Sequence, residues 1–174
     1  VGEIRDKETA EIAIQASLTG HLVFATIHTN DAPGAVTRLV DMGVEPFLVS
    51  SSLLAVLAQR LMRKVCKRCT EQYVPAAAEL ENLGLDPDVF GGQKIARSKG
   101  CHECSGTGYR GRMVVHELMD INDDVRTLIM EKADASAIKK AATKNGMVSL
   151  RVNGIQKVLE GVTTAVELVA VTQE

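Results

Sequence analysis

Two Cys-x-x-Cys pairs constrain the fold of this chain more than any other feature of its sequence. They lie within residues 66–112, which hold all four Cys, two of the four Pro and seven of the 14 Gly. A segment this rich in turns buries little apolar surface, so it needs a cross-link or a metal to hold one structure. Two residues between cysteines let both sulfurs approach one ion, and four thiolates complete the tetrahedral shell of a structural zinc. Zinc bound by Cys66, Cys69, Cys101 and Cys104 is therefore the preferred interpretation.

Two other interpretations of the cysteines stay open, namely four reduced thiols without metal and two disulfides. The first residues lack the basic and apolar segments of a secretory signal peptide, and in such chains paired Cys-x-x-Cys units indicate metal binding before disulfides. Lys67, Arg68 and Arg110 would offset the charge of four thiolates. His102, between the last two cysteines, is expected to be solvated.

Before the cysteines, helix and strand patterns alternate. Asp6 is a suitable N-cap for a first helix, and the apolar run 22–27 predicts a strand buried on both faces, as in a parallel sheet. Further helices are expected over residues 33–42 and from residue 47 to about residue 64. This alternation is typical of a doubly wound α/β core.

After the cysteines, residues 113–121 predict a strand and the tail predicts helices. Asn122 caps the first, others cover 136–144 and 150–160, and Thr164 with Glu167 forms a capping box for the last. The expected organisation is an α/β core over residues 1–65, a zinc subdomain over 66–112, and a strand with helices over 113–174.

Composition argues against two classes of partner. The net charge is -2, with 20 basic and 22 acidic residues, whereas duplex DNA binders carry an excess of basic charge. Aromatic residues make up 3% of the chain, too few for stacking on single-stranded bases. No nucleic-acid partner is therefore expected. The chain also lacks the run of about 18 apolar residues that a membrane-spanning helix needs.

Glu3 and His28 are expected at one edge of the predicted sheet, because Glu3 lies where a preceding strand would end and His28 follows the run 22–27. Ligands of open α/β folds bind at that edge. A carboxylate there holds Mg²⁺ or orients a water for attack on a γ-phosphate. Spacing alone leaves open a solvated Glu and a structural His. Arg5 and Arg112 are candidate phosphate contacts, with surface ion pairs as the alternative.

Several short motifs follow one another in a fixed order: residues 1–9, 19–23 with 26–30, 38–39, 45–48, 58–61 and 108–112. Together with the paired cysteines, they resemble the motifs of type II secretion and type IV pilus assembly ATPases. The likeness is specific up to about residue 120 and looser beyond it. It implies an α/β fold with part of a RecA-like P-loop NTPase core, a small zinc-binding subdomain and a C-terminal helical subdomain.

The resemblance also implies a function. Such proteins are cytoplasmic hexameric motors, peripheral at the inner membrane, that couple ATP hydrolysis to pseudopilus or pilus assembly. Their partners are further copies of themselves and inner-membrane platform proteins, and they use ATP, Mg²⁺ and structural zinc. By the resemblance, Glu3 is the Walker B acid, His28 belongs to the histidine box, Arg5 and Arg112 support nucleotide binding or turnover, and the four cysteines bind zinc.

The run 45–54 favours the type II secretion branch, with a pilus extension ATPase as the alternative. The family needs a phosphate-binding loop ending in Gly-Lys, and this chain contains no Gly-Lys pair. The loop is therefore expected upstream of Val1, and the fragment alone is expected to be inactive.

Two interpretations outside this family were weighed. Residues 101–108 also resemble the zinc repeat of J-protein chaperones, although that repeat occurs in several copies and here only once. A zinc-ribbon nucleic-acid module is the other, and the near-neutral charge argues against it.

Overall fold

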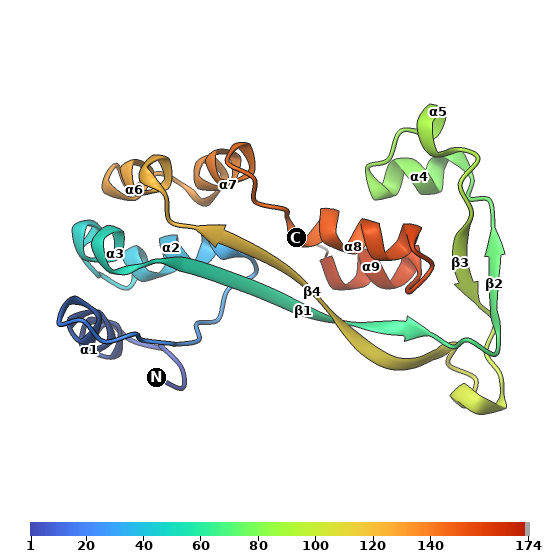
Figure 1. Ribbon diagram of the computed structural model, residues 1–174, viewed down its shortest axis with the longest axis horizontal. Coiled ribbons are helices and arrows are strands. Elements are labelled where there is room, and N and C mark those ends of the chain that lie inside the picture. Colours follow the sequence, from blue (N-terminus) through green and yellow to red (C-terminus); the bar gives the residue numbers. More distant parts are fainter. Residues whose placement is uncertain (173–174) are drawn as a thin grey trace. The chain divides into compact units, whose positions relative to one another are not determined.

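The computed structural model of the chain describes residues 1–172, which fold into two compact units (Figure 1). The first unit combines Val1–Ala58 with Glu117–Ser149, and the second combines Gln59–His116 with the C-terminal residues from Leu150 onward. Both units mix helices and strands, which confirms the predicted α/β class. The division into segments 1–65, 66–112 and 113–174 stays a prediction.

Side-chain caps begin most helices of the first unit. Asp6, Asp31, Asn122 and Asp134 each accept a hydrogen bond from a backbone amide in the first turn, which satisfies an otherwise unpaired donor. In this unit α3 packs against α1, α2 and α6, and α7 packs against α2 and α6 (Figure 1). The helices are α1 (Lys7–Leu18), α2 (Ala32–Asp41), α3 (Pro46–Ser52), α6 (Asp123–Met130) and α7 (Ala135–Lys144).

Two pairs of strands form the sheets. β1 (Ala55–Val65) pairs with β4 (Tyr109–Asp120), and both strands contribute residues to each unit. β2 (Thr70–Tyr73) pairs with β3 (Ile95–Ser98) in antiparallel register. The strand predicted over residues 113–121 is confirmed as part of β4.

The second unit contains the remaining helices, including the last two of the predicted tail. There α8 packs against α9 and β3, and α4 against α5 and α9. Thr164 caps α9, since its Oγ1 accepts from the Glu167 amide at 3.2 Å, but the Glu167 side chain does not complete the capping box and pairs with Arg63 instead. The helices are α4 (Ala77–Leu83), α5 (Pro87–Phe90), the 3₁₀ turn η1 (His102–Cys104), α8 (Leu150–Leu159) and α9 (Ala165–Thr172).

The predicted long helix over residues 47–64 is wrong. Helix α3 ends at Ser52, Leu53 is extended, and β1 follows. Ala58 and Met62 are both buried, four residues apart. A spacing of four fits one helical turn and also two strand periods, so it cannot distinguish the two structures. Pairing with β4 decides in favour of the strand.

The predicted buried strand over residues 22–27 is also wrong. The segment is extended, but only Ile27 forms a bridge, parallel to Ile4. Leu22 is 72% exposed and Phe24 78% exposed. Within residues 1–172 no further strand flanks this segment, so its apolar side chains have no layer to pack against.

Across the part of the chain that is described, the helices are too short or too polar to cross a bilayer.

Arg63 and Glu167 join α9 to β1 within the second unit. The Arg63 guanidinium donates to Glu167 Oε2 from Nε at 2.9 Å and from Nη2 at 2.6 Å, and its backbone amide donates to Oε1 at 2.9 Å. The guanidinium also lies 4.1 Å from the centre of the Tyr109 ring, whose hydroxyl contacts Thr164 Oγ1 at 2.7 Å. The Glu167 carboxylate is buried, and these donors replace the water that it loses.

Glu167→Ala should lower the free energy of unfolding of the second unit by about 2–3 kcal/mol, less than for a fully buried pair because Arg63 is half-exposed. Burial opposes ionisation of Glu167, but the bonds from Arg63 outweigh it and keep its pKa below 4.5. A carboxyl with a lowered pKa stabilises the fold above its unfolded pKa, and this contribution disappears as the pH falls through the folded value. Glu167→Gln removes the charge at this position. The difference in the free energy of unfolding between the wild type and this variant should therefore become smaller below about pH 4.5.

Hydrogen exchange of the α9 amides measures this effect in the second unit alone. Glu160→Ala is the matched control, since its exposed pair with Lys157 is expected to contribute less than about 1 kcal/mol. If both substitutions changed the exchange of the α9 amides equally, Glu167 would not be the residue that holds α9 to β1.

Candidate functional site

The four cysteine sulfurs form one cluster. They all lie within 4.8 Å of one another. Three of the separations are Cys66–Cys101 at 3.9 Å, Cys69–Cys104 at 3.8 Å and Cys101–Cys104 at 3.7 Å. Sulfurs bound at about 2.3 Å to one tetrahedral zinc lie about 3.8 Å apart, whereas a disulfide bond is about 2.05 Å long. The spacing therefore fits a shared ion rather than two disulfides.

Backbone amides point at the sulfurs of the cluster. Cys104 Sγ accepts from the amides of Cys101 at 3.1 Å and Gly108 at 3.2 Å. Burial alone would raise the pKa of Cys104, but these amide bonds outweigh it and lower the pKa to about 6. Burial and the neighbouring thiols raise the pKa of Cys69 to about 12. Of these two thiols, Cys104 is therefore the one that loses its proton more readily.

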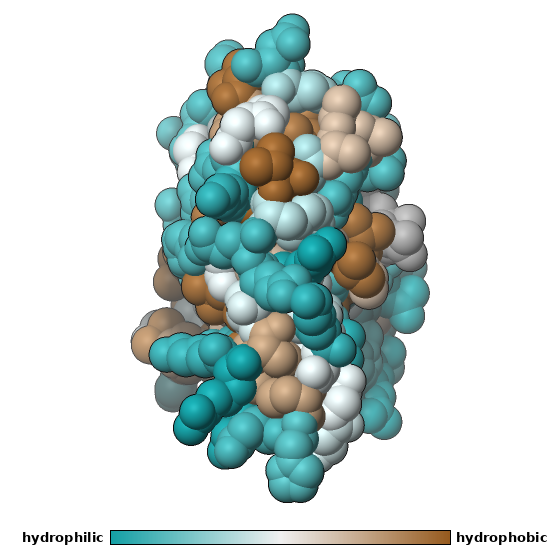
Figure 2. All heavy atoms as spheres, turned by 90° about the vertical axis from the view of Figure 1, so that its right-hand side faces the viewer, coloured by the Kyte–Doolittle hydropathy of each residue, from teal (hydrophilic) through white to brown (hydrophobic). Residues whose placement is uncertain are grey.

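Glycine at position 100 is required for the turn that brings the second pair to the first. Its φ is +90°, and a Cβ atom there would collide with the Gly106 carbonyl oxygen. The surface around this turn-rich segment, on the side of β2 and β3, is largely hydrophilic with only scattered apolar side chains (Figure 2). The segment buries a few apolar side chains, among them Leu80, Leu83 and Ile95, and a small turn-rich segment of this kind is expected to need a cross-link as well.

Glu3, Arg5 and His28 form a second cluster, in the first unit. Arg5 donates to Glu3 Oε2 from Nε at 2.7 Å, and its Nη2 lies 2.6 Å from the same oxygen in an ion pair. His28 Nε2 lies 2.6 Å from Glu3 Oε1, but outside the angles of a hydrogen bond, so among the described residues this buried oxygen has no donor. The Arg5 hydrogen bond lowers the pKa of Glu3 against the opposing effect of burial, and His28 lowers it further.

The parallel bridge places Glu3 beside His28. The Ile4 amide donates to the Thr26 carbonyl at 2.7 Å, and Thr26 Oγ1 donates to the Gly2 carbonyl at 2.6 Å. Glu3 precedes the bridged Ile4 and His28 follows the bridged Ile27, so the two side chains approach each other diagonally across the parallel bridge. An ionised carboxylate with one free oxygen beside an imidazole that is 90% exposed can hold a cation or orient a water.

Two further groups, Arg112 and Glu117, are not part of this cluster. Arg112 is exposed on β4 in the second unit, and its role stays a prediction. Sequence reasoning missed Glu117, a carboxylate that is 1% exposed on β4. A charged residue at an inward position of an alternating strand was the signal that could have found it.

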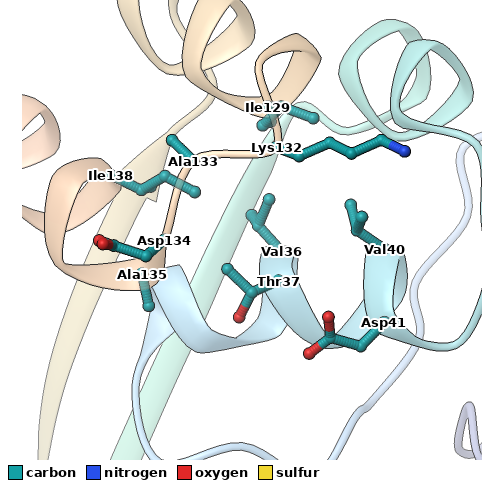
Figure 3. Close-up of a pocket in the computed structure, with 10 residues that line it drawn as sticks. All are labelled: Val36, Thr37, Val40, Asp41, Ile129, Lys132, Ala133, Asp134, Ala135 and Ile138. Atoms are coloured by element: carbon teal, nitrogen blue, oxygen red, sulfur yellow. The ribbon is translucent and has the colours of Figure 1, made fainter.

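The first unit also contains a cavity of about 400 Å³ between α2 and the α6–α7 turn (Figure 3). Apolar side chains form most of its wall, and Asp41, Lys132 and Asp134 are its charged residues. The residues that line it do not include Glu3 or His28, so the candidate catalytic pair lies outside this cavity.

Comparison with known proteins gives the same family over nearly the whole chain. The family described as type II/IV secretion system protein matches residues 1–170. Type II secretion system protein E of Pseudomonas aeruginosa is 53% identical over 174 residues, which are 100% of this chain and 34% of that protein. Type IV pilus assembly ATPase PilB of Thermus thermophilus is 49% identical, over 100% of this chain and 20% of that protein.

Two solved structures share the fold. The pilus retraction motor PilT with bound ADP has a TM-score of 0.63 at 24% identity, over 98% of this chain and 38% of that chain. The ATPase DotB of Legionella pneumophila has a TM-score of 0.61 at 18% identity, over 97% of this chain and 36% of that chain. The chain therefore spans between 20% and 38% of the length of these four proteins.

Proposed function

Since the chain belongs to the family of type II/IV secretion system proteins, as its motifs indicate, we propose that it is the C-terminal part of a secretion ATPase. The observation that carries this proposal is the Glu3 carboxylate, whose Oε1 has no donor among the described residues and lies 2.6 Å from His28. The same two residues are the Walker B acid and the histidine-box residue by resemblance. Residues 1–65 are then part of a RecA-like core, and the helices after β4 form the C-terminal helical subdomain.

In this proposal the side chains of Glu3 and His28 act on the γ-phosphate of bound ATP. Glu3 Oε1 accepts a hydrogen bond from the attacking water or from a water bound to Mg²⁺, and the lowered pKa keeps the carboxylate ionised for that task. Mg²⁺, when bound with ATP, neutralises charge that develops on the phosphates. His28 reaches the same region through its exposed ring. Arg5 orients Glu3 through Oε2, which leaves Oε1 for the reaction.

The cysteine cluster is proposed as a structural zinc site. Cys66, Cys69, Cys101 and Cys104 supply four sulfurs, and their spacing fits a closed tetrahedral shell without an open position for substrate. Zinc then stabilises the turn-rich segment between β1 and β4 and takes no part in ATP hydrolysis.

The whole protein is proposed to be a hexamer on the cytoplasmic side of the inner membrane, where it works with platform proteins of the secretion system. The phosphate-binding loop lies upstream of this chain, so residues 1–174 alone do not hydrolyse ATP. The relative from Pseudomonas aeruginosa at 53% identity and the run 45–54 favour type II secretion. Pilus extension is the second candidate, because PilB of Thermus thermophilus is 49% identical.

The test is ATP turnover and genetic complementation. The full-length protein should hydrolyse ATP when oligomerised, and residues 1–174 alone should not. Returned to a strain that lacks it, the protein should restore export of secreted enzymes into the medium. If the protein restored pili but left the export of enzymes unchanged, it would be assigned to the pilus branch of the family. Absence of turnover in the oligomerised full-length protein would refute the ATPase.

A further inference from the structure

Glu117 is a charged residue in an apolar row. It lies on the inward side of β4 between Val115 and Met119, and all three side chains are buried. Removing a carboxylate from water costs several kcal/mol, and a well-packed apolar residue is often as stable at such a position. The contacts of the carboxylate should therefore explain why a charged residue is present at this position.

The carboxylate binds the beginning of α2. Oε1 of Glu117 accepts from the amide of Ala32, the first residue of that helix, at 2.7 Å. Asp31, the N-cap, accepts from the Gly34 amide at 2.9 Å, and Lys139 Nζ on α7 lies 3.4 Å from its Oδ2. Both acids lie where the dipole of α2 favours negative charge. The first turn of α2 is thus fixed to β4 and to α7, all within the first unit.

This turn lies directly after His28. Three residues separate His28 from Ala32 along the chain, and Thr29 Oγ1 donates to the Asp31 carbonyl at 3.0 Å within that short connection. On the other side of His28, Ile27 is held by its bridge to Ile4, next to Glu3. His28 therefore lies on a short segment between two fixed points, the bridge and the bond from Ala32 to Glu117.

We propose that Glu117 is a positioning residue, which holds the segment 28–31 so that His28 stays beside Glu3. The inference rests on the proposed ATPase function. A hydrocarbon side chain at this position would leave the buried Ala32 amide without its acceptor, and the first turn of α2 would shift or fray. Gln keeps an acceptor oxygen within reach but loses the charge.

The experiment compares Glu117→Leu and Glu117→Gln with the wild type in the full-length protein. Glu117→Leu should lower kcat for ATP hydrolysis about 100-fold, as expected for a misplaced catalytic group, with KM changed less than about twofold. Glu117→Gln should retain kcat within about tenfold of the wild type. Exchange of the Ala32 amide should become at least about tenfold faster in Glu117→Leu. Asp120→Asn, an exposed carboxylate on the same strand, is the matched control and should change none of these.

Two results would overturn the inference: a normal kcat in Glu117→Leu, or an equal loss in Glu117→Gln and Glu117→Leu. If Glu117→Leu does not fold, Glu117→Gln decides, because a loss of kcat beyond about tenfold with unchanged exchange at Ala32 would also overturn the inference. Failure of the proposed function is a separate outcome. Absence of turnover in the oligomerised wild-type protein refutes the ATPase assignment, whereas exchange at Ala32 reports the link to Glu117 without any turnover.

Discussion

Glu3→Gln in the full-length protein should lower kcat for ATP hydrolysis by about 10³-fold while ATP still binds. Gln has nearly the same shape, so the bridge between Ile4 and Ile27 should persist. The substitution removes the negative charge that polarises a water or holds a hydrated Mg²⁺. It also weakens the bonds from Arg5, which now fix the carboxylate at 2.6–2.7 Å.

Turnover by released phosphate and binding by a fluorescent ATP analogue measure the two effects separately. The matched control is Glu11→Gln on α1, a half-exposed acid that pairs with Lys7 at 3.5 Å. Because the hydrogen bond from Arg5 keeps the pKa of Glu3 below 4.5, Glu3 stays ionised from pH 5 upward. Any loss of rate between pH 5 and 7 should therefore come from another group. Undiminished turnover in Glu3→Gln would remove Glu3 from the mechanism.

The sequence predicted the local features of this fold well. Asp6 and Asn122 cap helices as expected, because a side-chain cap needs only residues within one turn. The cysteine cluster was also predictable, since a Cys-x-x-Cys pair specifies its own geometry and the glycines around it mark the turns. Glu3 and His28 were expected close together, and their side chains lie 2.6 Å apart, although the segment 22–27 forms one bridge and not the predicted strand.

Features that depend on distant partners were not predictable. Residues 55–65 carry a four-residue spacing that fits both helix and strand, and only pairing with β4 selects the strand. The segment 22–27 has a strand composition, but the structure gives it one bridge and two highly exposed apolar side chains. Glu117 binds an amide 85 positions away, and no local pattern specifies that partner. The contacts of Glu167 with Arg63 are of the same kind, 104 positions apart.

Cys101→Ser should reduce bound zinc from about one per chain to a small fraction of that. Residues 66–112 should then lose their ordered structure. The Cys101 sulfur lies 3.7 Å from that of Cys104 and 3.9 Å from that of Cys66, so its loss opens the tetrahedral shell. A serine hydroxyl stays protonated at neutral pH and binds zinc weakly, whereas the thiolate is the natural ligand.

Elemental analysis of the purified protein measures the metal, and hydrogen exchange over residues 66–112 measures the structure. His102→Ala is the matched control, because His102 lies between Cys101 and Cys104 but is exposed and outside the cluster. It should keep its zinc and its exchange pattern. Loss of zinc in His102→Ala would place His102 in the ligand set, and unchanged zinc in Cys101→Ser would refute the four-sulfur site. Because the cluster and Glu3 belong to different units, the metal and the turnover can be lost independently, and measuring both in each variant separates a structural zinc from a catalytic one.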